Sequence, residues 1–192
     1  MLKDIEIKTD EHTVSFPCQI NLETGLIEVV LCSPQGKTHE SLLVTNVTPL
    51  EFQTAIMLLG LDPVNEVPEE PSMADSLSPY LSIETPGDSV LIFIESNLNG
   101  KSERKRVEDF IKDESKGGTL SHTTWLFRGA VTHRSGHVII DPETTMIATY
   151  HDALALMELN TESKFNDELY YVNNKLKLTK GQTVKLIIQA IN

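Results

Sequence analysis

The hydrophobic and polar positions of this chain alternate with a period of two over most of its length, the pattern of half-buried β-strands. In the first quarter, four such segments are separated by Gly, Pro, Asn and Asp, the residues that favour turns. The turn "SPQG" has Pro34 and Gly36 at the positions that a type I turn favours. We therefore predict an antiparallel meander with strands at 5–8, 13–20, 26–32 and 39–45.

The stretch 48–60 breaks this alternation and predicts a well-capped helix. Thr48 suits the N-cap, Pro49 the first helical position, and Glu51 completes a capping box. Apolar residues then recur at helical spacing until Gly60, which is a typical stop. We expect this helix to pack its apolar stripe on the sheet.

Residues 61–88 contain five prolines, several acids and little periodicity. Loops of this length in compact domains are usually functional covers or disordered segments. At 192 residues the chain has the length of one domain, so we interpret 61–88 as a loop or insertion within a single domain, 1–192.

Alternation resumes after residue 88, and the apolar run "DALALME" predicts a short second helix at 152–158. The second half also holds turn residues at "NLNG", "RSG" and "TKGQ", which predict hairpins. The fold class predicted is α+β, mostly antiparallel sheet with one well-capped helix and one short helix. The remaining strands are predicted at 89–96, 101–111, 123–133, 137–141, 145–151, 168–173, 175–178 and 183–191.

The charge balance narrows the choice of partners. Sixteen Lys and Arg against 28 Asp and Glu give a formal net charge of −12 and a pI near 4.9, which disfavours nucleic acid. The basic run "KSERKR" at 101–106 is interpreted as a solvated strand face. No apolar run reaches the ~18 residues of a membrane span, and the first residues lack the apolar region of a signal peptide.

Cys18 and Cys32 are the only cysteines, and both lie in β-like segments. A hairpin centred on Glu23 and Thr24 would pair Cys18 with Val29 and not with Cys32. Disulfide geometry is strict, so two buried free thiols are favoured over a bridge.

The stretch "GKTHESLL" at 36–43 concentrates polar chemistry at the start of an apolar strand. In a regular strand His39 and Ser41 share one face and Glu40 lies on the other, so His39 and Glu40 cannot chelate one ion together. Glu40 shares its face with apolar residues, and a buried carboxylate needs a partner. It is either part of a structural lock near the helix, which we favour, or an acid or base with a raised pKa. Its candidate partners are Arg104, Arg106, Arg128 and Arg134.

The stretch "TTWLFRGAV" places Trp125 and Phe127 on one face and Leu126 and Arg128 on the other. Trp125 is interpreted as a core residue. A part-buried Arg128 requires a carboxylate partner, and we predict the pair Glu40 and Arg128.

Signals for catalysis and for cofactors are weak. His133 and His137 flank a tight turn and are weak candidates for metal ligands, although surface turn histidines are the favoured interpretation. The chain has no nucleophile elbow and no glycine-rich phosphate loop. We therefore expect no cofactor.

Several of these segments together resemble the YdjY-type domain, a family of mostly exported bacterial proteins without an assigned activity. The similarity covers roughly residues 10–190, and its most specific parts are Lys37-Thr38-His39-Glu40-Ser41 and Trp125-x-Phe127-x-Gly129. Arg128 and Ala130 depart from the small residues that members commonly carry there. The resemblance implies a periplasmic or cell-envelope location, which in turn favours oxidation of Cys18 and Cys32 against the register argument. It supplies no catalytic residues.

These observations lead to two functional hypotheses. The first is a non-enzymatic binding or structural module of the bacterial cell envelope, with a polar cluster of Lys37, His39, Glu40, Ser41, Trp125 and Arg128. The second is a hydrolase, possibly metal-dependent, in which His39 acts with His122 or His151 beside Glu40 and Ser41.

Overall fold

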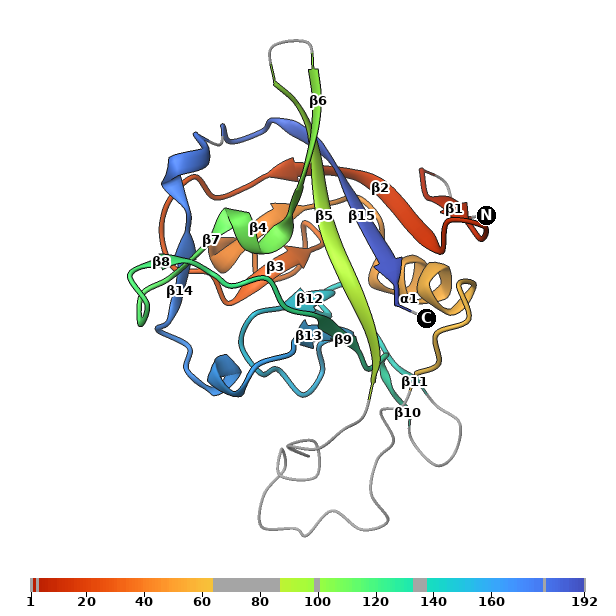
Figure 1. The fold of residues 1–192 in the computed structure, drawn as a ribbon. Coiled ribbons are helices and arrows are strands. Elements are labelled where there is room, and N and C mark those ends of the chain that lie inside the picture. The colour runs from red at the N-terminus through yellow and green to blue at the C-terminus, as the bar shows by residue number, and fades with distance from the viewer. Residues whose placement is uncertain are drawn as a thin grey trace, which may run out of the picture.

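A closed β-barrel of eight strands is the centre of the computed structural model (Figure 1), which describes residues 2, 4–63, 87–98, 101–132, 138–177 and 179–191. Each strand pairs with the next, and the last pairs again with the first. Around the barrel the order is β2 (Thr13–Ile20), β15 (Thr183–Ala190), β5 (Asp88–Leu98), β9 (Trp125–Phe127), β13 (Met157–Leu159), β12 (Ile147–Ala148), β3 (Val29–Cys32) and β4 (Ser41–Val44).

The predicted α+β class is therefore wrong, because the described residues form a mostly β barrel with one α-helix. The second helix expected at 152–158 is absent. Ala155 N donates to Asp152 O in a turn, and β13 then begins at Met157. A short apolar run is compatible with either a helix or a buried strand, and here pairing with β9 and β12 selected the strand.

The predicted meander at 5–45 is also wrong. β2 and β3 do not pair with each other, because β4 lies between them. β4 is antiparallel to β2 but parallel to β3, and β12 and β13 form a second parallel pair. The connection from β3 to β4 runs through the turn at Gly36 and a short 3₁₀ helix, η1 (Thr38–Glu40), which allows the chain to return in the same direction.

Smaller elements cover the barrel. β1 (Glu6–Lys8) pairs with β2 in antiparallel orientation. β6 (Lys101–Arg106) forms the expected hairpin with β5, and this hairpin projects past the end of the barrel (Figure 1). A second sheet contains β14 (Tyr170–Val172), β7 (Ile111–Asp113) and β8 (Gly118–Thr119), and β10 (Val131–Thr132) pairs with β11 (Val138–Ile139). Within the described ranges the chain also forms the 3₁₀ helices η3 (Val107–Phe110), η4 (Glu162–Phe165) and η5 (Asn174–Leu176).

The expected closing pair of 175–178 and 183–191 does not form. Part of the first segment is η5, and β15 instead lies between β2 and β5 along most of its length. Alternation correctly predicted a strand here, but alternation alone does not identify its neighbours.

The capped helix is confirmed as α1 (Pro49–Met57). Thr48 Oγ1 accepts from Glu51 N at 3.2 Å, and Glu51 Oε2 accepts from Thr48 N at 2.9 Å, so both halves of the capping box are present. α1 packs Phe52 edge-on against Phe16 of β2, with ring centroids 6.0 Å apart. Gly60 follows the helix with a φ of +89°, which glycine adopts without strain.

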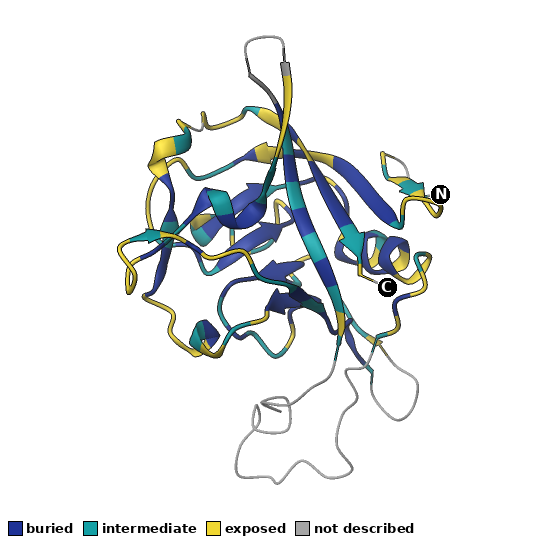
Figure 2. Ribbon diagram, in the orientation of Figure 1, coloured by how far each residue is buried: buried dark blue, intermediate teal, exposed yellow. Residues whose placement is uncertain are grey.

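The strands of the barrel consist mostly of buried residues (Figure 2). Phe16, Ile20, Ile92 and Leu186 are at most 1% exposed and belong to one hydrophobic cluster that also includes residues of α1. An eight-stranded barrel has an interior just wide enough for side chains to fill. A binding site must therefore be sought on the outside.

Two predictions concern residues that the structure leaves undescribed. Positions 64–86 of the predicted loop or insertion, and the positions of His133, Arg134 and His137, lie outside the described ranges. Within the described ranges, no helix has the length and apolar character needed to cross a membrane.

The capping box gives a direct test of α1. Thr48→Ala removes the acceptor for Glu51 N and should lower the free energy of unfolding by about 0.5–2 kcal/mol in urea denaturation. Thr48→Ser keeps the oxygen and should stay close to wild type. Equal losses for both variants would contradict the capping role.

Candidate functional site

The polar block at 37–41 does not start a strand, because Thr38–Glu40 forms η1. His39 is exposed, whereas Ser41 is fully buried and donates from Oγ to Leu43 O at 2.7 Å. His39 and Ser41 therefore do not share a face, and no pair of catalytic groups forms there. His39 Nε2 instead lies 3.6 Å from Glu40 Oε2, a proximity that regular strand geometry excluded.

Glu40 belongs to a charged group near the barrel surface and does not contact Arg128. Lys37 Nζ lies 3.8 Å from Glu40 Oε1 and 3.6 Å from Asp152 Oδ2. The neighbouring Glu28 has a raised pKa, first because it is partly buried and then because of the negative charge of Glu40, which Lys37 opposes. The predicted pair of Glu40 and Arg128 is wrong.

Arg128 instead belongs to a buried charged cluster centred on Glu158. Arg128 Nη1 donates to Glu158 Oε2 at 3.1 Å, and His151 Nδ1 lies 2.7 Å from the same oxygen. Lys164 Nζ donates to Glu158 Oε1. All four residues are buried. Arg128 follows β9, His151 lies between β12 and β13, Glu158 is in β13 and Lys164 is in η4. Sequence analysis missed Glu158 because it had been assigned to a helix.

Glu158 is held in its ionised form, which indicates a structural role. Burial favours the neutral acid, but hydrogen bonds from His151 and Lys164 and the charge of Arg128 outweigh burial and lower the Glu158 pKa to about 2. A carboxylate with this pKa is a poor general acid or base near neutral pH. The cluster therefore connects three parts of the chain: β13, η4 and the segment that follows β9.

Trp125 is buried in a second cluster. Its Nε1 donates to Glu108 Oε1 at 3.1 Å, and Arg106 Nη2 donates to the same oxygen at 2.7 Å. Glu108 is fully buried, so its carboxylate requires these partners. The indole therefore lies in the core and does not line a surface site.

Gly129 explains part of the Trp125-x-Phe127-x-Gly129 pattern. Its φ is +72°, and a Cβ there would lie 2.3 Å from the Cβ of Pro63, so no side chain fits. The next residue, Ala130, donates from N to Gln53 Oε1 of α1 at 2.6 Å. This block fixes the helix to the barrel.

The histidines of the hydrolase hypothesis each have a separate carboxylate partner. His39 lies next to Glu40, His122 Nε2 is 2.9 Å from Asp109 Oδ1, and His151 contacts Glu158. Among the residues that the structure describes, no group of three or more His, Cys, Asp or Glu could hold a metal.

Both cysteines are buried free thiols. Burial raises the pKa of Cys18 to about 12 and also raises that of Cys32. The hairpin register that paired Cys18 with Val29 is wrong, since Cys18 lies opposite Val184 of β15.

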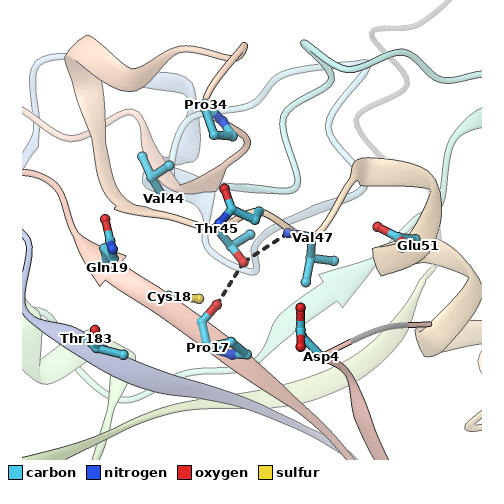
Figure 3. A pocket seen from close by; sticks show the side chains of 11 residues that line it. Asp4, Pro17, Cys18, Gln19, Pro34, Val44, Thr45, Val47, Glu51 and Thr183 are labelled. Atoms are coloured by element: carbon cyan, nitrogen blue, oxygen red, sulfur yellow. Dashed lines mark hydrogen bonds between the residues drawn. The ribbon is translucent and has the colours of Figure 1, made fainter.

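A groove of about 610 Å³ lies on the outside of the barrel where β2 meets β4 and α1 (Figure 3). Here β2 changes neighbours: Thr13 to Ser15 pair with β1, and Gln19 and Ile20 pair with β4. Its lining residues are Asp4, Pro17, Cys18, Gln19, Pro34, Val44, Thr45, Asn46, Val47, Glu51 and Thr183.

Pro17 occupies the gap between these two sets of partners. It lacks an N–H, and its carbonyl accepts from Thr45 Oγ1 at 2.8 Å, as the dashed line in Figure 3 shows. Thr45 Oγ1 in turn accepts from Val47 N at 3.2 Å. These two hydrogen bonds fix the floor of the groove, although β2 has no strand partner on this side at Pro17. Sequence analysis missed the groove because its residues are far apart in the chain.

The described walls of the groove are polar and acidic. Asp4 and Glu51 supply two carboxylates, and Gln19 and Asn46 supply amides, while Lys, Arg and His are absent from the lining residues. The Cys18 thiol, which also lines the groove, stays protonated near neutral pH because burial raises its pKa.

The fold is a closed eight-stranded β-barrel domain with a groove on its outer wall. The chain belongs to the YdjY domain family, whose model matches residues 5–189. No curated protein and no solved structure matches the chain.

The buried cluster predicts a large effect of Glu158→Gln. Removing one partner of a buried ion cluster leaves uncompensated charge, so the free energy of unfolding at pH 7 should fall by about 3–5 kcal/mol. Glu95→Gln, which breaks the exposed pair with Arg104, should change it by less than about 1 kcal/mol. Urea denaturation measures both, and equal small losses would contradict a structural role for the cluster.

The same cluster sets a pH dependence. The folded-state pKa of Glu158 is about 2, below the ordinary value of 4.5, so the stabilisation is present above pH 4.5 and is lost as pH falls towards 2. The difference between wild type and Glu158→Gln should therefore shrink over that interval in urea denaturation. A difference that stays constant between pH 4.5 and 2 would show that ionised Glu158 is not the source of the stabilisation.

Proposed function

We propose that this protein is a non-enzymatic binding or structural module of the bacterial cell envelope, and that it binds its ligand in the groove between β2, β4 and α1. The resemblance to mostly exported bacterial proteins supports the location. The groove supports the activity, because it is an external cavity of about 610 Å³ whose described walls hold polar groups, and its Cys18 thiol has a pKa raised by burial.

The charges of the groove favour a cationic ligand. Asp4 and Glu51 are the charged side chains among the described residues that line the groove, and the whole chain carries a net charge of −12. Hydrogen bonds from Thr48 lower the pKa of Glu51, so this carboxylate is ionised near neutral pH. A ligand with amino or guanidinium groups would gain from both carboxylates.

Binding of a short peptide of alternating Lys and Ser tests this proposal. In NMR titrations, the side-chain amides of Gln19 and Asn46 and the backbone amide of Thr183 should shift together. Asp4→Asn should weaken binding about two- to fivefold, as expected for loss of one exposed charge interaction. Asn also tolerates the positive φ of +71° at this position, so the backbone should be unaffected.

Asp167→Asn is the matched control, because Asp167 is exposed and does not line the groove. It should leave the affinity for the Lys–Ser peptide unchanged. Shifts confined to Lys37, His39 and Glu40, or equal weakening by both Asp→Asn variants, would contradict the groove as the binding site.

A further inference from the structure

The outward face of α1 is apolar, although it faces solvent. Leu50 and Leu58 are each 58% exposed and Met57 is 43% exposed. Successive helical residues turn by about 100°, so these three residues form one stripe along the helix, with Thr54 between them. We call Leu50, Met57 and Leu58 the α1 stripe.

A surface helix normally has polar residues opposite its buried face. The buried face of α1 holds Phe52, Ala55 and Ile56, so the α1 stripe makes the helix apolar on both sides. An isolated exposed Leu needs no explanation, but a row of three large apolar side chains on one short helix indicates a contact surface.

The α1 stripe adjoins the groove. Glu51, which lines the groove, directly follows Leu50. It also lies about two helical turns before Leu58 and about 20° from it around the helix axis. A partner lying on the stripe would therefore meet the carboxylates of Glu51 and Asp4 at its edge. An apolar surface bordered by acidic groups complements an apolar surface bordered by basic groups.

A second copy of this chain is a poor occupant. α1 has nine residues and is about 13.5 Å long, so its outward face alone is too small for the roughly 800 Å² per partner of a stable interface. Two copies would also bring together the same acidic groups and two chains with a net charge of −12.

We infer that the α1 stripe and the groove together bind an amphipathic basic polypeptide segment of another protein, with its apolar side chains on Leu50, Met57 and Leu58 and its basic side chains towards Asp4 and Glu51. This inference rests on the proposed function and specifies its ligand class. Apolar residues spaced as on one helix face would contact the stripe, as in helix recognition by apolar surfaces.

A synthetic amphipathic helix of Leu and Lys is the probe, and its affinity is measured by fluorescence anisotropy. The Leu50→Ser/Leu58→Ser variant should bind it at least about tenfold more weakly than wild type, because two buried leucine contacts are lost. Leu154→Ser, at an exposed leucine outside α1, is the matched control and should bind as wild type does. A Leu–Glu helix should not bind.

The Lys–Ser peptide distinguishes failure of this inference from failure of the proposed function. If that peptide binds in the groove while the Leu–Lys helix binds wild type and Leu50→Ser/Leu58→Ser equally, the inference fails and the groove proposal stands. If neither peptide binds, both fail.

Thermal melting and sedimentation test the state of the stripe in the free protein. The melting midpoint of Leu50→Ser/Leu58→Ser should equal or exceed that of wild type, because the leucines are exposed. A fall of more than about 5 °C would mean that the chain itself covers the stripe and would overturn the inference. A wild-type dimer that this variant dissociates would identify a second copy as the occupant and overturn it equally.

Discussion

Closure of the sheet where β4 pairs with β2 is the constraint on which the rest of the structure depends. In this contact Gln19 lies opposite Val44 and Ile20 opposite Leu43, and Asn21 N donates to Leu42 O at 2.8 Å beside them. This short contact joins the two ends of the eight-stranded sheet. Closure satisfies the backbone groups that two free strand edges would expose, and it encloses an apolar interior. It also leaves Pro17 beside the contact, where the missing N–H removes no ladder bond.

The filled interior explains why the charged residues inside have structural roles. Glu158 and Glu108 are buried, and each is held by an arginine and by further donors. The Glu158 carboxylate stays ionised and fixes the segments that contact it, whereas a catalytic carboxylate at neutral pH usually has a raised pKa. On the outer wall, the change of neighbours along β2 opens the groove beside α1, where we propose that the ligand binds.

Local signals in the sequence predicted local structure well. The capping box at Thr48, the hairpin of β5 and β6, and the burial of Trp125 and Phe127 follow from residue type and alternation, and the structure agrees with them. Membership of the YdjY family was also correctly predicted from the sequence blocks. These features depend on neighbours within a few residues or within one strand.

Long-range pairing could not be predicted in the same way. Alternation marks a strand but not its partner, so the insertion of β4 between β2 and β3 and the barrel closure were missed. The partner of Arg128 was missed for the same reason, because Glu158 lies in a segment whose apolar run also fits a helix. The groove is assembled from residues of β2, β4, α1, the first residue of β15 and nearby loops, and no single segment indicates it.

The reactivity of Cys18 and Cys32 tests the closed barrel most directly, since both thiols lie beside the β2–β4 contact. Cys18 immediately precedes Gln19, and Cys32 lies opposite Val44. With both side chains buried and unbridged, the native protein should react with a thiol reagent only as fast as it unfolds, and the denatured protein should show two thiols per chain. Rapid modification of native Cys18 or Cys32, or the absence of free thiols after denaturation, would contradict the closed barrel with free buried thiols.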